Sequence, residues 1–299
     1  MKQGIAFSVG ASVLFGFIYY YSTVLEPLTG SEVFAWRILI GLPVLAVFIH
    51  KIKQWDEVLC VGKRLITDFR FFLWMFAGAV LFGLQVWIFV WAPIHNMALD
   101  VSLGYFLLPL IMVVAGRVFY KETLTWLQWL AVACAAVGVL HEFWRAGSFS
   151  WATALVAFGY PPYFMLRRYL RVGTLPSLWF DFLFLLIPVL YVFSTQELSL
   201  VSQFMEAPRF FFQVPFFGLV SSVALLGYLA ASRLLPLGLF GLLSYVEPVL
   251  LFWVAFLFLG EPIAPDEWWS YIPIWIAVGL LATEGAWKLR LQGAASKAD

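Results

Sequence analysis

Long apolar runs are the feature that most constrains this chain. Ten segments of about 20 residues, the length of a helix that crosses a bilayer, are almost free of charge. They cover residues 4–24, 32–50, 71–92, 97–119, 125–143, 150–168, 175–194, 210–233, 237–258 and 269–288. The stretch 234–259 is apolar at nearly every position, whereas strands of a membrane barrel alternate apolar and polar side chains. The runs therefore predict an all-α polytopic membrane protein with ten transmembrane helices.

Composition excludes several other classes of protein. Of the 299 residues, 63% are hydrophobic and only 12% are charged, whereas soluble domains contain about 25% charged residues. A net charge of +1 without a basic block argues against a nucleic-acid partner. The two cysteines, Cys60 and Cys134, cannot form a disulfide scaffold. The first run lacks a small-x-small cleavage site before Glu26, so we interpret it as a retained helix and not as a signal peptide.

The basic residues predict the orientation in the membrane, because cytoplasmic loops are enriched in Lys and Arg. If the N-terminus is cytoplasmic, the inner connections and tails hold 15 of the 18 basic residues, the outer ones hold Arg145 and Arg209, and Arg37 lies within the second helix. An even number of helices then puts the C-terminus in the cytoplasm as well.

The two halves of the sequence carry a similar pattern about 140 residues apart. A tyrosine precedes a proline by three or four residues, and a glutamate follows that proline by thirteen: Tyr105, Pro109 and Glu122, then Tyr245, Pro248 and Glu261. Five helices per half require the second half to be inverted, an architecture of secondary transporters whose substrate site lies at the repeat interface. We expect repeats at 1–145 and 146–292 and a cytoplasmic tail at 293–299. The alternative is a chance match between two apolar runs.

Charges within apolar helices are costly, so each one is a candidate site residue. Glu247 lies in the middle of the ninth helix beside Pro248, with Ser244 three residues earlier on the same face. We expect Glu247 to contact a proton or a substrate amine. The alternative is a structural carboxylate bonded between helices.

Three other polar positions are candidates, each with a structural alternative. Asp100 opens the fourth helix, where Gly104 leaves room for a ligand and Tyr105 lies on the next stripe; the alternative is a carboxylate at the outer headgroups, next to the helix N-terminus. Arg37 suits a ligand carboxylate or a buried acid, and Asp181 is the corresponding charge of the second half. For both, an ion pair within the protein is the alternative. Gln85 is the uncharged polar candidate.

Aromatic residues add a further expectation. Tyr19 and Trp36 belong to a group of aromatics on the first three helices, some of which must face inward. An aromatic wall near acids would hold an organic cation by cation–π contact. Packing and lipid contact are the alternatives.

The motifs together resemble a known family over nearly the whole chain. They are Asp100 followed by Ser102-Leu103-Gly104-Tyr105-Phe106-x-x-Pro109-Leu110, then Glu32-Val33-x-x-x-Arg37, Ala230-Ala231-x-Arg233-Leu234 and Tyr245-x-x-Pro248. This combination is similar to the RarD-like branch of the drug/metabolite transporter superfamily, whose members contain EamA domains.

The resemblance implies two inverted five-helix EamA repeats in a bacterial inner membrane. It also implies a central cavity lined by helices one to four and six to nine, with helices five and ten at the periphery as a homodimer contact. Family substrates are amino acids, amines, drugs and related metabolites. This chain departs from the branch pattern at Gln85 and Leu108, where Asn is usual, at Trp36, where His is usual, and at Glu247, where a small residue is frequent. These changes favour a ligand with an amine or quaternary ammonium, and with a carboxylate for Arg37.

The expected function is that of a secondary transporter working by alternating access, driven by the substrate gradient or by protons through Glu247. No phosphate-binding Gly-x4-Gly-Lys-Ser/Thr motif occurs, and the sequence indicates no cofactor or metal. A channel-like facilitator is the first alternative. An intramembrane enzyme is the second, but His50, His95 and His141 are isolated and no paired Asp motif occurs.

Overall fold

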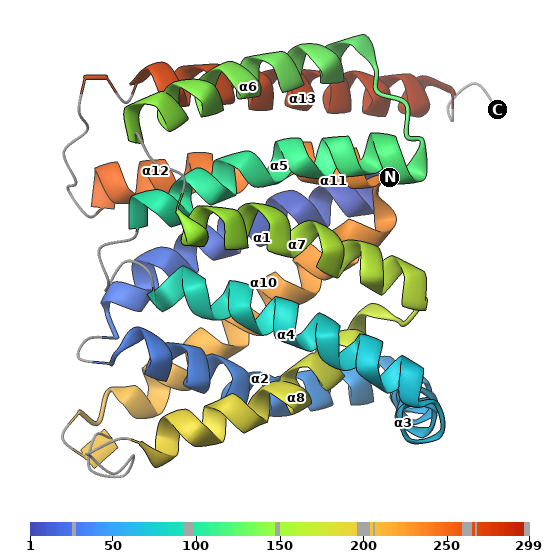
Figure 1. Cartoon of the computed structure of the whole chain (residues 1–299), viewed down its shortest axis with the longest axis vertical. Helices are drawn as coiled ribbons and strands as arrows, with labels where there is room; N and C mark the ends of the chain where they lie inside the picture. The colour runs from blue at the N-terminus through green and yellow to red at the C-terminus, as the bar shows by residue number, and fades with distance from the viewer. Residues whose placement is uncertain are drawn as a thin grey trace.

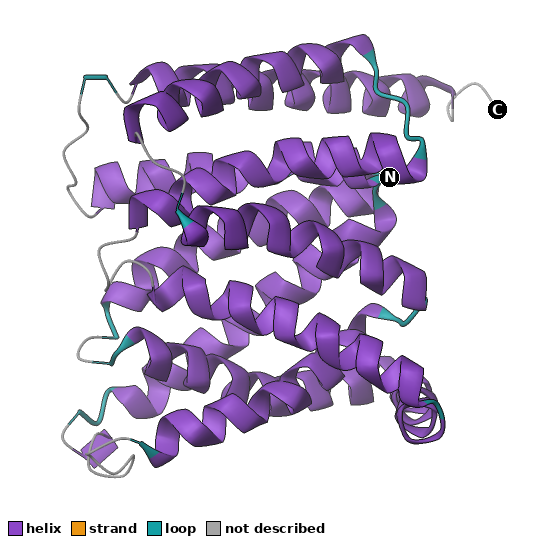
Figure 2. Cartoon of the chain, viewed as in Figure 1, coloured by secondary structure: helices purple, strands orange, loops and turns teal. Residues whose placement is uncertain are grey.

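A computed structural model describes residues 1–25, 28–91, 98–146, 150–195, 204–205, 207–258, 265–266 and 268–295. Within these residues the regular structure is entirely helical (Figure 2). The helices are α1 (Lys2–Thr23), α2 (Gly30–Ile52), α3 (Trp55–Thr67), α4 (Phe69–Trp91), α5 (Ala98–Tyr120), α6 (Trp126–Ala146), α7 (Trp151–Leu170), α8 (Thr174–Ser194), α10 (Phe210–Leu234), α11 (Leu237–Leu243), α12 (Val246–Phe258) and α13 (Trp268–Ala295).

The chain is a multi-span membrane protein. Among the described residues, six helices, α1, α2, α4, α6, α8 and α10, are long and apolar enough to cross a membrane by length and composition. Shorter apolar stretches cover Gly104–Tyr120, Leu237–Leu250 and Trp268–Leu281. Every predicted apolar run coincides with helical structure to within a few residues at its start, and the ninth run is divided between α11 and α12.

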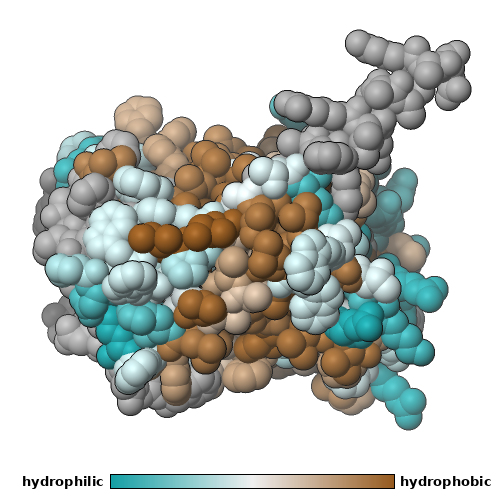
Figure 3. All heavy atoms as spheres, turned by 90° about the horizontal axis from the view of Figure 1, so that it is seen from above, coloured by the Kyte–Doolittle hydropathy of each residue, from teal (hydrophilic) through white to brown (hydrophobic). Residues whose placement is uncertain are grey.

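The helices other than α3 run side by side, with their ends at two opposite edges of the bundle (Figure 1). One edge carries the N-terminus, α3 and the α5–α6 and α7–α8 connections; we call it the basic edge, because Arg64, Arg117, Lys121, Arg168, Arg171 and Arg233 lie at the helix ends there. In Figure 3, which looks onto α6 and α13, brown apolar side chains occupy the middle of the face and teal polar ones lie toward the basic edge. This distribution is that of a protein surrounded by lipid at its middle.

The layers of the bundle follow from pairwise helix packing. Helix α6 packs on α13 at one end of the long axis, and α2 packs on α8 near the other (Figure 1). Between them α1 packs on α10 and α12, and α7 packs on α4 and α5. A capping box starts α2: Thr29 Oγ1 accepts a hydrogen bond from the Glu32 amide at 3.3 Å, and Glu32 Oε2 accepts one from the Thr29 amide at 2.6 Å. This cap fixes the helix end that precedes Arg37.

Helix α3 is absent from the sequence-based prediction. With thirteen residues, α3 is too short to span a bilayer. Its charged residues lower its mean hydropathy, so the search for apolar runs did not find this amphipathic helix. Val58, Val61 and Leu65 turn toward the bundle, where the last two pack on a cluster around Phe71. Figure 1 shows α3 almost end-on, so it runs across the direction of the other helices.

The ninth predicted helix is interrupted at Ser244 and Tyr245, between α11 and α12. Pro248 has no N–H to donate to the Ser244 carbonyl, which accepts a 3.3 Å hydrogen bond from the Glu247 amide instead. The start of α11 is capped from outside its own segment. Glu122, in the α5–α6 connection, accepts hydrogen bonds from the amides of Leu237 at 2.6 Å and Gly238 at 2.8 Å. Glu122, one of the two glutamates in the repeated Pro-to-Glu spacing, thus has a structural role, whereas Glu261 lies outside the described residues.

Replacing Glu122 by Ala removes both acceptors and the negative charge that the N-terminal end of α11 favours. We expect the free energy of unfolding to fall by about 1–2 kcal/mol, the usual value of a helix cap with its charge. Thermal unfolding in detergent measures the change. Asp56→Ala, which removes an exposed carboxylate at the same edge, serves as the control and should stay within about 0.5 kcal/mol of wild type. Equal stability of the two variants would contradict the capping role.

Candidate functional site

A polar cluster lies where five helices meet. It consists of Arg37 on α2, Tyr105 on α5, Tyr160 on α7, Tyr228 on α10 and Glu247 at the start of α12, and we call it the central cluster. Arg37 interacts electrostatically with Tyr160, Tyr105 and Glu247, and Tyr228 interacts with Tyr160 and Glu247. One cation, one carboxyl group and three phenols are therefore within interaction range of one another.

The cation of this cluster is deeply buried. Arg37 is 4% exposed, and its Nε is a buried donor with no hydrogen-bond partner among the described residues. A guanidinium remains charged in proteins and carries five donors in a fixed fork. Arg37 thus has a hydrogen-bonding capacity that the described protein atoms do not fill, which suits a ligand carboxylate.

The hydroxyl groups connect the helices around the cluster. The Tyr160 side chain interacts with that of Tyr105, and the Tyr228 side chain interacts with that of Ser244. Ser244 Oγ also donates to the Phe240 carbonyl at 3.0 Å. Glu247, Tyr105 and Tyr160 remain partly exposed although they lie near the middle of the bundle. They are therefore the most exposed members of the cluster.

Aromatic rings close the cluster on the side of Tyr228. This ring lies 4.8 Å from Phe240, 5.7 Å from Phe164 and 5.8 Å from Phe15, measured between centroids. The Tyr160 ring stacks on Phe164 at 5.8 Å. Phenol and phenyl faces next to a carboxylate provide the surroundings in which an organic cation is held by cation–π contact.

Gln85 fits a packing role between α4 and α7. It is fully buried, and its Nε2 donates to the Leu155 carbonyl at 2.8 Å, while its Oε1 has no hydrogen-bond partner among the described residues. A Cβ on Gly159 would lie 2.0 Å from Nε2, so only glycine at this position admits the Gln85 amide. The amide therefore fixes the α4–α7 contact beside Tyr160.

Asp181 is placed away from the central cluster. Its carboxylate forms a buried ion pair with Arg167 Nη2 and accepts a hydrogen bond from the Tyr163 hydroxyl at 3.1 Å. Arg167 also donates to the Met75 sulfur at 2.8 Å. These contacts correspond to the alternative that the sequence left open for Asp181, an ion pair within the protein. The prediction that it touches substrate remains untested.

Asp100, Trp36 and Tyr19 also have identified neighbours. The Asp100 carbonyl accepts a hydrogen bond from Thr153 at 2.7 Å, and the space expected beside Gly104 is filled by α7, because a Cβ there would lie 2.7 Å from Val156. The Trp36 ring packs on Phe193 and Phe204 at 5.3 and 5.0 Å, and the Tyr19 ring lies 6.4 Å from Phe89. The structure thus brings Arg37, Tyr105, Ser244 and Glu247 together. Phe89 also lies 5.9 Å from the Tyr105 ring, so Tyr19 is one ring away from the central cluster.

Two members of the central cluster, Tyr160 and Tyr228, are missing from the sequence-based candidates. A signal for Tyr160 was present, because the offset of about 140 residues maps the tyrosines at 19–21 onto 159–161. Tyr228 has no such signal, since the same offset leads back to Ile88.

Comparison with known proteins identifies the family. The model of the EamA-like transporter family matches residues 2–141. The chain is 46% identical to the chloramphenicol-sensitive protein RarD of Pseudomonas aeruginosa, over 97% of both chains. The chain belongs to the EamA-like transporter family. It is thus a membrane transporter and not an enzyme, and the resemblance noted in the sequence is confirmed.

Other relatives of this transporter are more distant. An uncharacterized transporter of Pasteurella multocida is 39% identical over 97% of this chain and 99% of its own, and the protein RarD of Escherichia coli is 27% identical over 97% of each. A solved crystal structure with 16% identity superposes with a TM-score of 0.66, covering 93% of this chain and 96% of the other. That similarity supports the EamA fold.

Proposed function

We propose that this transporter moves a small zwitterion, amine or quaternary ammonium compound across a bacterial inner membrane by alternating access. The observation that carries the proposal is the central cluster, where Arg37 and Glu247 lie within electrostatic range of each other among three tyrosines. Arg37 suits a ligand carboxylate, and Glu247 with the phenol faces suits an ammonium group. A zwitterion satisfies both charges at once.

The proposed mechanism needs two inverted repeats, residues 1–145 and 146–292, with ten spans. Packing supports this division, since α1 packs on α10 and α12 as α7 packs on α4 and α5. The pairs α2–α8, α5–α11 and α6–α13 join equivalent helices of the two halves. The same contacts thus recur when the halves are exchanged, as in inverted-repeat transporters with a site at the repeat interface.

The clustering of cations at the basic edge supports cytoplasmic termini and a cytoplasmic tail at 293–299. Exposed apolar residues on α6, among them Val137 and Leu140, are available for a homodimer contact, which stays a prediction. Proton coupling is assigned to Glu247, whose carboxyl group can exchange a proton whenever the substrate amine leaves.

The ligand is sought first by thermal-shift measurements on the purified transporter, with amino acids, betaines and amines. Chloramphenicol is included because the Pseudomonas relative carries it in its name. We expect a zwitterion or amine to raise the unfolding temperature. Glu247→Gln should abolish that shift for either compound, and Arg37→Gln should abolish it for a zwitterion.

Transport is then measured in proteoliposomes by counterflow of the ligand found. We expect saturable counterflow, and Glu247→Gln should abolish transport or its response to a pH gradient. The matched control is Glu284→Gln. Glu284 is also a buried glutamate, but it accepts a 2.9 Å hydrogen bond from the hydroxyl group of Thr125, directly before α6. Unchanged transport and pH response in Glu247→Gln would overturn the role of Glu247. Flux without counterflow would favour the channel-like alternative.

A further inference from the structure

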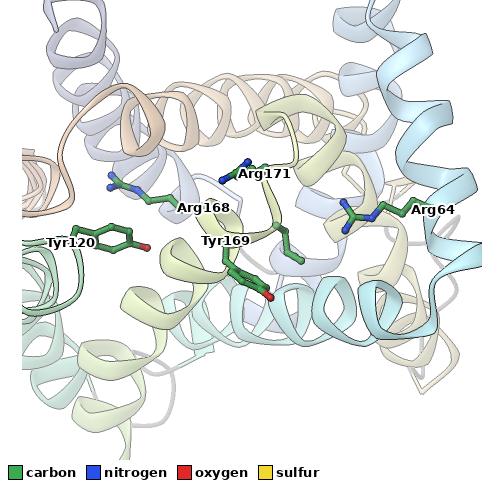
Figure 4. A pocket seen from close by; sticks show the side chains of 6 residues that line it. Arg64, Tyr120, Arg168, Tyr169 and Arg171 are labelled. Carbon is green, nitrogen blue, oxygen red and sulfur yellow. The ribbon is translucent and has the colours of Figure 1, made fainter.

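A second site lies at the basic edge, away from the central cluster. A pocket of about 480 Å³ opens between α3, α5 and α7. Figure 4 shows Tyr120, Arg168, Tyr169, Arg171 and Arg64 around it, and Leu170 completes the lining. Three of the six lining side chains are guanidinium groups and none is a carboxylate. The pocket is therefore built for an anion.

The three arginines differ in how firmly they are held. Arg168 is fixed, because its Nη2 donates to the carbonyls of Ser232 at 2.7 Å and Leu235 at 2.6 Å, and its Nη1 lies 3.6 Å from Glu122. Arg64 is 53% exposed; its guanidinium lies 3.9 Å from Asp68, an exposed ion pair that contributes little, and 3.9 Å from the centre of the Phe71 ring. Arg64 is therefore held less firmly than Arg168, and its exposed side chain can turn toward a bound anion.

Among the three arginines of the pocket, Arg171 has the fewest partners for its positive charge. It is exposed, and within the part of the chain that the structure describes its guanidinium has no hydrogen bond or ion pair. It ends α7 in the left-handed backbone conformation, with φ of 53°. The partial negative charge at the end of α7 opposes an anion. Glu122 and Asp68 already lie beside Arg168 and Arg64, so the full charge of Arg171 is the main one that outweighs this opposition.

Helix α3 indicates the level of this pocket relative to the membrane. Leu59 and Ile66 lie two turns apart on one flank and are 59% and 88% exposed, with the exposed Lys63 between them, while Arg64 lies on the opposite flank. A helix that runs across the bundle direction with an exposed apolar flank and a charged one is typical of the lipid–water interface. The pocket, which α3 borders through Arg64, is thus at the depth of lipid headgroups.

We propose that this pocket binds the phosphate of an anionic phospholipid. Guanidinium groups pair with phosphate oxygens in a bidentate manner, and basic pockets between transmembrane helices at the cytoplasmic side recognise anionic headgroups. Tyr120 and Tyr169 at the rim are amphipathic side chains suited to the interface. The acyl chains lie along the apolar surface of the bundle.

The test uses the purified full-length transporter with phosphatidylglycerol and, separately, phosphatidylcholine. Bound lipid is counted by native mass spectrometry, and affinity is measured by titration in detergent. One arginine near an anionic headgroup contributes about 1 kcal/mol, so Arg171→Gln should weaken phosphatidylglycerol binding about fivefold, and Arg64→Gln/Arg171→Gln about 30-fold. Phosphatidylcholine binding should stay weak in every variant.

The matched control is Lys53→Gln. Lys53 is an exposed cation at the same edge that also ends its helix in the left-handed conformation, with φ of 57°, but it does not line the pocket. The Lys53→Gln variant should bind phosphatidylglycerol with wild-type affinity. Undiminished binding in the double variant, or equal loss in Lys53→Gln, would overturn the proposal. Displacement of the lipid by millimolar inorganic phosphate, with phosphate binding lost in the double variant, would assign the pocket to free phosphate instead.

Discussion

Replacing Asp181 by Ala is expected to lower the free energy of unfolding by about 3–5 kcal/mol, the usual cost of removing one partner from a buried ion pair. The change leaves Arg167, which is 3% exposed, without its carboxylate and Tyr163 without its acceptor. A guanidinium cannot lose its proton to escape this cost. The remaining contacts of Arg167 in the described chain include a hydrogen bond to the Met75 sulfur and the Tyr163 ring, whose centre lies 5.3 Å from the guanidinium carbon, and these are weak substitutes for a carboxylate.

Stability in detergent is measured together with ligand affinity. The double variant Arg167→Met/Asp181→Ala should recover most of the lost stability, because replacing both members of a buried pair by apolar groups is often neutral. Asp100→Ala, which removes an acid from the first turn of α5, is the control and should change stability far less. A single Asp181→Ala variant with wild-type stability but lost ligand binding would contradict the structural role and restore Asp181 to the substrate site.

Asp181 also illustrates where sequence reasoning about this chain reaches its limit. Arg167 precedes Arg168 and Arg171, so the three looked like one cytoplasmic group that sets orientation. In the structure Arg167 turns into the bundle while Arg168 binds carbonyls at the end of α10 and Arg171 remains exposed. Neighbouring residues on a helix point in different directions, and only the packing of α7 on α4 and the position of α8 decide which cation is buried.

The helices themselves were predictable because apolar length is a direct physical requirement of a bilayer. The exceptions have local causes. Helix α3 is short and charged, so hydropathy alone does not reveal it, and the interruption at Ser244 needs both Pro248 and the distant cap from Glu122. Of the site, Arg37 and Glu247 were predictable from the cost of burying charge. Tyr160 and Tyr228 were not selected, because tyrosines are common in this chain and their hydroxyl partners come from other helices.

Arg37 and Glu247 interact with each other, so the decisive question is whether they also hold a ligand. Arg37→Gln is expected to lower the affinity for a zwitterion by at least about 30-fold, since losing one partner of a buried charge pair costs about 2–5 kcal/mol. Glu247→Gln should have an effect of similar size. Binding and counterflow of the zwitterion found in the screen, and of the amine that lacks its carboxylate, measure both losses.

The double variant Arg37→Gln/Glu247→Gln separates the two possibilities through a double-mutant cycle. If the two charges serve only each other, removing both leaves no unpaired charge, and binding and transport return close to wild type. If each charge holds an opposite group of the substrate, the double variant recovers thermal stability but binds no better than the weaker single variant. We expect the second result. We also expect Arg37→Gln to affect the zwitterion far more than the amine, because only the zwitterion has a carboxylate for the guanidinium to bind. Equal losses for both compounds would show that Arg37 acts by positioning Glu247 and not by contact with the substrate.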